Sequence, residues 1–190
     1  MSLNNPMDPL SKLALKYGTD KGPNPGWHQY TDKYHRLMAP FREQVRSVLE
    51  IGVYHGASLR MWRDYFPNAE IYGLDCAREV TPESLWLLND EPRMHVIVGN
   101  QHDAKDVGQV IDKGAPFDVV IDDGSHAWSD YLFSLDYLWP HTTRVYIIED
   151  VCPQFMRDTM LAVNHTNDVC FSEIILSQTD GETVAIALVR

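Results

Sequence analysis

The chain has 190 residues, of which 44% are hydrophobic and 23% are charged, and its formal net charge is −11 at pH 7. This length and composition suit one globular domain with a full core. No apolar run is long enough to cross a membrane. The acidic balance argues against nucleic acid as a partner, because a protein that grips phosphates needs a basic face.

Cysteine usage and the N-terminus indicate the compartment. Cys76, Cys152 and Cys170 lie far apart in the sequence, so they form neither a disulfide framework nor a thiolate zinc site. No basic region followed by an apolar stretch opens the sequence, as it would in a signal peptide. We therefore expect a reducing, cytoplasmic setting.

Residues 1–45 are predicted to form an N-terminal helical segment, with short helices at 8–17 and 30–37 around a loop at 22–26. In residues 46–190, strands and helices alternate. The predicted strands are 47–53, 70–75, 95–98, 117–122 and 144–148. The predicted helices are 58–66, one that opens at Thr81 and Pro82, 104–112, 126–138 and 152–164. Two final strands, 171–177 and 183–189, flank a turn that contains Asp180 and Gly181, which is a hairpin signal.

This alternation predicts an α/β fold, a Rossmann-like three-layer sandwich. The sheet is expected to be mostly parallel, with an antiparallel strand supplied by the C-terminal hairpin. Open sheets of this kind bind ligands beyond the carboxyl ends of their strands. The residues that directly follow each strand are therefore the candidates for a functional site.

The first three strand ends have the features of a nucleotide-type cofactor site. Gly52 and Gly56 follow the first strand, and their Gly-x-x-x-Gly spacing differs from the Gly-x-Gly-x-x-Gly of the dinucleotide fingerprint. Asp75 ends the second strand, where a carboxylate can accept hydrogen bonds from ribose hydroxyls. A polar turn at 99–103 follows the third strand. Ordinary βα-turn glycines and a solvated Asp75 are the alternative interpretation.

The next two strand ends are acidic. The fourth strand ends at Asp122 and Asp123, with His126 shortly after, and the fifth strand ends at Glu149 and Asp150. Carboxylates gathered at one sheet edge repel one another, and a divalent cation with a preference for oxygen ligands would relieve this repulsion. The alternative is that Asp123 and Asp150 cap the helices that follow them.

Several stretches of the sequence resemble a known family. The Leu49-Glu50-Ile51-Gly52 turn, the acidic strand end and the polar turn resemble the class I S-adenosylmethionine-dependent methyltransferases. The stretches 16–21, 30–31, 49–52, 58–62, 121–126 and 148–150 resemble, more narrowly, the metal-dependent sugar O-methyltransferases of macrolide and related antibiotic pathways. The likeness is specific at these motifs over residues 16–150, and beyond Asp150 it extends only to the fold.

The resemblance implies a role for each candidate residue. Asp123, Glu149 and Asp150 would hold Mg²⁺ or Mn²⁺, and His126 would be the general base. The cofactor S-adenosylmethionine would lie on the other strand ends. The residues expected to bind it are Glu50, Gly52, Gly56, Ser58, Asp75, Asn100, Gln101, Asp103 and Asp122.

The expected function is a metal-assisted O-methylation of a small-molecule hydroxyl, on a sugar or a glycosylated natural product. We expect neither a membrane nor nucleic acid as a partner. The sequence leaves open whether the chain forms a homo-oligomer. The family also has a large extra N-terminal domain, for which this chain offers about thirty residues at most, judged from where its first strand pattern begins, so the acceptor is open too. The alternatives are an S-adenosylmethionine-binding accessory protein without turnover, a methyltransferase of a catechol or nucleic acid, and, more distantly, a nicotinamide-dependent dehydrogenase.

Overall fold

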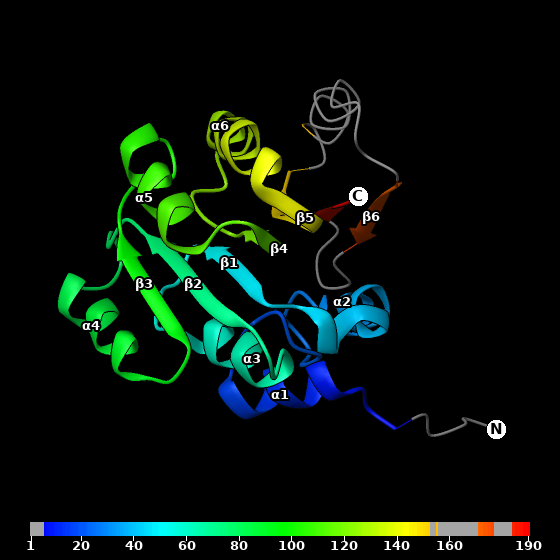
Figure 1. Ribbon diagram of the computed structural model, residues 1–190. Coiled ribbons are helices and arrows are strands. Elements are labelled where there is room, and N and C mark those ends of the chain that lie inside the picture. The colour runs from blue at the N-terminus through cyan, green and yellow to red at the C-terminus, as the bar shows by residue number, and fades with distance from the viewer. Residues whose placement is uncertain (1–5, 153–154, 156–170, 177–183) are drawn as a thin grey trace.

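The computed structural model describes residues 6–152, 155, 171–176 and 184–190. Within these residues, seven strands form one sheet in the order β3-β2-β1-β4-β5-β7-β6. Figure 1 shows this sheet crossing the centre of the molecule. The strands are β1 (Ser47–Ile51), β2 (Glu70–Asp75), β3 (Met94–Val98), β4 (Phe117–Asp122), β5 (Thr142–Val151), β6 (Phe171–Leu176) and β7 (Val184–Val189).

Strands β1 to β5 run parallel, whereas β7 is antiparallel both to β5 and to β6. The predicted Rossmann-like fold with a mostly parallel sheet and an antiparallel C-terminal pair is confirmed. The last strand of the chain, β7, lies between β5 and β6. The turn expected around Asp180 lies outside the described residues, as does most of the helix expected at 152–164.

Helices cover both faces of the sheet. Helices α1, α2 and α3 lie on one side of it, and α5 and α6 lie on the other (Figure 1). The helices are α1 (Pro9–Tyr17), α2 (Thr31–Met38), α3 (Ala57–Tyr65), α4 (Pro82–Trp86), α5 (Ala104–Gly114) and α6 (Trp128–Leu138). Short 3-10 helices occupy Ala39–Gln44, Leu87–Asp90 and Trp139–His141.

The central strand β4 shows why the sheet has two cores. Val119 and Ile121 belong to the apolar cluster beneath α1, α2 and α3, and Val120 belongs to the cluster beneath α5 and α6. Successive strand residues point to opposite faces, so a nearly continuous apolar run fills both cores. This burial holds the strands in one register, and the register places their carboxyl ends at a common edge.

Several predicted boundaries differ from the structure, and for three of them the backbone shows the reason. Strand β1 ends at Ile51 instead of residue 53, because Gly52 has a φ of +84° and leaves the extended region. Helix α6 begins at Trp128 instead of residue 126, because His126 has a φ of +59°. Strand β5 extends to Val151, where it pairs with Val184 of β7. In the part of the chain that the structure describes, no helix has the length and hydropathy to cross a membrane.

Candidate functional site

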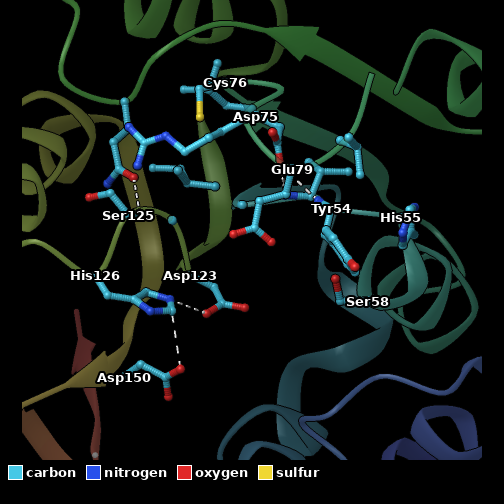
Figure 2. A pocket seen from close by; sticks show the side chains of 18 of the residues that line it. Tyr54, His55, Ser58, Asp75, Cys76, Glu79, Asp123, Ser125, His126 and Asp150 are labelled. Atoms are coloured by element: carbon cyan, nitrogen blue, oxygen red, sulfur yellow. Dashed lines mark hydrogen bonds and ion pairs between the residues drawn. The ribbon is translucent and has the colours of Figure 1, made fainter. Parts of the chain in front are cut away.

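A cavity of about 640 Å³ lies beyond the carboxyl ends of the parallel strands. Residues at the carboxyl ends of β1, β2 and β5 and in the loops after β1 to β4 line it, together with residues 18–21 of the N-terminal segment. We call the part around Gly52, Asp75 and Asn100 the glycine half. The part around Asp123, His126 and Asp150 is the carboxylate half. Figure 2 shows Asp75 and His126 on the walls of one continuous pocket.

The turn after β1 depends on glycine. Gly52 has a φ of +84°, a backbone conformation that L side chains rarely adopt. A Cβ at this position would also overlap the backbone carbonyl of Asp123. Gly56, the left-handed N-cap of α3, packs against Leu88 instead of lining the cavity. Gly52 therefore lets the two halves of the cavity meet backbone to backbone.

Asp75 fastens the same turn to the end of β2. Its Oδ2 accepts hydrogen bonds from the backbone N–H groups of Val53 (2.8 Å) and Tyr54 (2.9 Å), and its Oδ1 accepts one from Ala77 (2.7 Å). A carboxylate has about four lone-pair positions, so Asp75 keeps acceptor capacity for a ligand. Its first role in this structure is to shape the wall of the glycine half.

The polar turn after β3 is fixed by its own contacts. Gln101 is buried; its Nε2 donates to Asp122 Oδ1 (3.1 Å), and its Oε1 accepts from the backbone N–H of Ser125 (2.7 Å). Asn100 Oδ1 accepts from the backbone N–H of His102 (2.9 Å). Asn100 and Gln101 line the cavity, so they stand where the sequence analysis expected them.

Three other candidates for cofactor binding lie outside the lining of the cavity. Glu50 is fully buried beneath it and accepts hydrogen bonds from Ser58 Oγ (2.6 Å) and Trp62 Nε1 (3.1 Å). Ser58 itself does line the cavity. Asp103 is the N-cap of α5, where it accepts from the backbone of Lys105 and Asp106.

The third candidate is Asp122, which is fully buried on the opposite face of β4 from Asp123. Its Oδ2 accepts a hydrogen bond from the Tyr146 hydroxyl (3.3 Å). Burial raises the pKa of Asp122 to about 7, against the hydrogen bonds that it accepts. Burial likewise raises the pKa of Glu50 to about 7, although Lys21 opposes the shift. Both groups act on the cavity through the residues they hold.

The carboxylate half brings three side chains to one point. Asp123, His126 and Asp150 each offer one donor atom, and these atoms all lie within 4.8 Å of one another. His126 Nε2 donates to Asp123 Oδ1 (3.2 Å) and lies 3.9 Å from Asp150 Oδ2 (Figure 2). His126 and Asp150 have positive φ values, +59° and +54°. Non-glycine residues in this region are uncommon, and they often occur at functional sites.

Glu149 is held apart from this group. Its side chain is buried, its Oε1 accepts from the Tyr34 hydroxyl (3.0 Å), and its Oε2 contacts Lys21 Nζ (2.7 Å). Asp150, the next residue, points instead into the cavity and accepts from the Tyr30 hydroxyl (3.0 Å). The N-terminal segment thus supplies the partners of both acidic residues at the end of β5.

A buried lysine dominates the electrostatics of this half. Burial alone would lower the pKa of Lys21, but Asp123, Glu149 and Glu50 outweigh it, so its pKa lies well above the ordinary value. Burial opposes the ionisation of Asp123, yet Lys21 and the hydrogen bond from His126 bring its pKa below the usual range. That same hydrogen bond is the main reason why the pKa of His126 is raised.

Sequence reasoning assigned no role to Lys21, Tyr30 or Tyr34. Lys21 and Tyr30 belong to the stretches 16–21 and 30–31 that carried the family resemblance, and Tyr34 lies outside them. Tyr30 and Tyr34 are four residues apart, at the start of α2, so they lie on one face of the helix. Which carboxylates they meet depends on how this segment packs against β5, which no local pattern shows.

Comparison with known proteins identifies relatives of this chain. The chain is 36% identical over 151 residues to 8-demethyl-8-alpha-L-rhamnosyl tetracenomycin-C 2'-O-methyltransferase of Streptomyces olivaceus. It is 38% identical over 152 residues to mycinamicin VI 2''-O-methyltransferase of Micromonospora griseorubida. Each match covers 75% of this chain, but only 37% and 36% of the two relatives. No family model matches the chain.

A solved structure agrees with these relatives. The MycE methyltransferase of the mycinamycin biosynthetic pathway, solved in complex with Mg and SAH, superposes with a TM-score of 0.75 and 28% identity. The match covers 97% of this chain and 56% of that one. The chain therefore belongs to the class I S-adenosylmethionine-dependent methyltransferases. Within that class it is homologous to part of the sugar O-methyltransferases of macrolide and tetracenomycin pathways.

Proposed function

We propose that the chain transfers a methyl group from S-adenosylmethionine to a hydroxyl of a small molecule, with the help of a divalent cation. The proposed acceptor is a sugar hydroxyl of a glycosylated natural product, as the names of the relatives suggest. One observation carries the proposal. A single cavity joins the glycine turn at Gly52 to the cluster of Asp123, His126 and Asp150.

The glycine half fits the cofactor. Gly52 turns at a positive φ with its Cα packed against the Asp123 carbonyl, so main chain without a side chain lines the cavity there and a ligand can approach the backbone closely. In this proposal Asp75 accepts hydrogen bonds from the ribose hydroxyls, and Asn100 and Gln101 meet the adenine edge; all three line the cavity. S-adenosylmethionine, when bound, supplies a methyl group activated by its sulfonium.

The other expected cofactor residues would act by positioning. Glu50 holds the Ser58 hydroxyl at the cavity wall, and Asp122 holds Gln101. Asp103 anchors the helix that follows the polar turn. These contacts keep the cofactor surface in one shape before the ligand arrives, which lowers the entropy cost of binding.

The carboxylate half fits a hard divalent cation. Asp123, Glu149 and Asp150 are the proposed ligands, and oxygen donors of this kind suit Mg²⁺ or Mn²⁺. Asp123 and Asp150 already face each other, whereas both oxygens of Glu149 contact Tyr34 and Lys21. Glu149 lies outside this cluster and outside the lining of the cavity, so its side chain would have to turn toward the cavity to bind the ion. A bound divalent cation supplies positive charge that lowers the pKa of an acceptor hydroxyl.

His126 is the proposed general base. An ionised carboxylate only accepts hydrogen bonds, so the contact with Asp123 assigns a proton to His126 Nε2. The neutral imidazole then keeps Nδ1 as the atom that takes the acceptor proton. Asp123 stabilises the resulting imidazolium, in line with the raised pKa of His126. The remaining work is alignment of the hydroxyl with the methyl group.

The test is a methyl-transfer assay on the purified chain with S-adenosylmethionine and a panel of glycosides that carry vicinal hydroxyls, with Mg²⁺ or with EDTA. We expect a product heavier by one methylene, and S-adenosylhomocysteine in equal amount, only with Mg²⁺. Full activity in EDTA would refute the metal assignment. Cofactor binding without transfer to any glycoside would favour the accessory protein without turnover.

A further inference from the structure

Lys21 is a buried charged residue that has no role in the proposed reaction. Its side chain is 2% exposed, and three carboxylates lie within 4 Å of its Nζ. It forms an ion pair with Asp123 Oδ2 and lies 2.7 Å from Glu149 Oε2 and 3.8 Å from Glu50 Oε1. Glu50 and Glu149 are themselves buried.

Backbone hydrogen bonds fix the position of Lys21. Its carbonyl oxygen accepts hydrogen bonds from the N–H groups of Tyr30 (3.0 Å) and Thr31 (3.2 Å), at the start of α2. The neighbouring Asp20 carbonyl accepts from the N–H of His28 (2.9 Å). The loop that contains Lys21 is therefore closed by the helix that also carries Tyr34, a second partner of Glu149.

Asp123 is shared between Lys21 and the cavity. Its Oδ2 contacts Lys21, while its Oδ1 contacts His126. Lys21 thus selects which oxygen of Asp123 faces the proposed metal ligands, and it occupies one oxygen of Glu149. A fixed ammonium at this place neutralises part of the carboxylate charge. It also repels any divalent cation that binds beside it.

We propose that Lys21 is the internal counter-ion of the carboxylate half, a positioning residue that holds Asp123 and Glu149 in place without metal and weakens the binding of metal. The second part rests on the proposed function, because it needs a cation at Asp123 and Asp150. The first part does not. Removal of one member of a buried ion pair leaves an uncompensated charge, which is strongly destabilising.

Thermal unfolding of the full chain in EDTA and in Mg²⁺ tests both parts. Lys21→Met keeps the length of the side chain and removes its charge. In EDTA we expect its midpoint to fall by roughly 6–20 °C. Lys16→Met is the control, because Lys16 is 57% exposed and pairs with Asp64 at the surface. Its midpoint should fall by no more than about 3 °C.

Mg²⁺ should raise the midpoint of Lys21→Met by more degrees than it raises that of the wild type, because the repelling ammonium is gone. In EDTA, the double variant Lys21→Met/Glu149→Gln should unfold at a higher temperature than Lys21→Met alone, because one uncompensated carboxylate is removed. This variant also keeps the test decisive if Lys21→Met does not fold.

A fall for Lys21→Met no larger than that for Lys16→Met would overturn the counter-ion role, as would a double variant no more stable than the single one. An equal Mg²⁺ gain in Lys21→Met and wild type would overturn the effect on metal binding. No Mg²⁺ gain in any variant would instead remove the metal from the proposed function, and the EDTA comparison would still decide the counter-ion role.

Discussion

The two halves of the cavity are built in different ways. In the glycine half, backbone groups make most of the contacts that form the cavity wall. Asp75 accepts from three backbone N–H groups, and Gly52 contributes only main chain. In the carboxylate half, side chains meet from distant parts of the sequence. Lys21 contacts Asp123 across 102 positions and Glu149 across 128.

The glycine half therefore depends mainly on the shape of its backbone, and the carboxylate half depends mainly on the charges of its side chains. A half made of backbone groups keeps its shape when a distant side chain is replaced, since its hydrogen bonds join the ends of adjacent strands. A half made of charged side chains depends on every member, because each carboxylate shifts the electrostatic balance of the others. Substitutions should therefore affect cofactor binding and metal-dependent chemistry separately, except at the point where the halves touch.

The largest effect is expected at the proposed base. His126→Ala should lower turnover by about 10²–10⁴-fold, the usual contribution of a general base. Its dissociation constant for S-adenosylhomocysteine should stay unchanged, because His126 belongs to the carboxylate half. Single-turnover kinetics and calorimetry measure the two quantities. His95→Ala is the control, because His95 pairs with Glu70 outside the cavity. A His126→Ala variant with wild-type turnover would exclude His126 as the base.

Gly52 is where the halves touch, so its replacement should damage both. Gly52→Ala forces a side chain into a positive φ and against the Asp123 carbonyl. We expect a loss of about 2–5 kcal/mol in the free energy of unfolding, from strain and overpacking together. Gly108→Ala is the matched control in α5, where a Cβ meets nothing within 4 Å; it should be neutral or stabilising. Denaturant titration compares them, and equal stabilities would contradict the assigned contact.

The adjacent carboxylates Asp122, the last residue of β4, and Asp123, the residue after it, offer a sharper comparison. Asp123→Asn should weaken Mg²⁺ binding, with activity recovering in part at excess Mg²⁺, because other oxygens remain to hold the ion. Asp122→Asn should leave Mg²⁺ affinity nearly unchanged, because Asp122 is buried on the other face with Gln101 and Tyr146. Calorimetric titration with Mg²⁺ measures both. The reverse pattern would mean that the metal site lies on the opposite face of β4.

Asp122 should also give the stability of the chain a pH dependence. Burial raises the pKa of Asp122 to about 7 from an ordinary 3.8. Its protonated form is therefore favoured in the folded state, and the stability that it contributes is lost as the pH rises from about 4 through 7. Asp122→Asn removes this titration, so its unfolding free energy should fall less than that of the wild type, by up to about 4 kcal/mol, over that range. Parallel curves of stability against pH would show that Asp122 is ionised throughout.

The same division explains what could be predicted from sequence. Gly52 and Asp75 belong to local patterns, strand then glycine turn and strand then acid, whose geometry follows from backbone rules. The parallel order of β1 to β5 follows from the alternation of strands and helices. Asp123 and Asp150 were placed together because both follow neighbouring parallel strands.

What was missed depends on packing between distant segments. Nothing local in residues 16–21 shows that Lys21 is buried, since a lysine in a polar loop is ordinarily exposed. The split between Glu149 and Asp150 follows from Tyr30, Tyr34 and Lys21, which pack against the end of β5. The place of β7 between β5 and β6 is likewise a choice of partners that a hairpin pattern leaves open.

Calorimetric titration of S-adenosylhomocysteine into Asp75→Asn and Asp123→Asn beside the wild type tests the division of the cavity most directly. We predict binding at one site in the wild type, weaker by at least about tenfold in Asp75→Asn, where about 1.4 kcal/mol or more of hydrogen bonding to the turn and ligand is lost. The Asp123→Asn isotherm should match the wild type. Equal weakening in both variants, or no binding in the wild type, would contradict a cavity divided into a cofactor half and a carboxylate half.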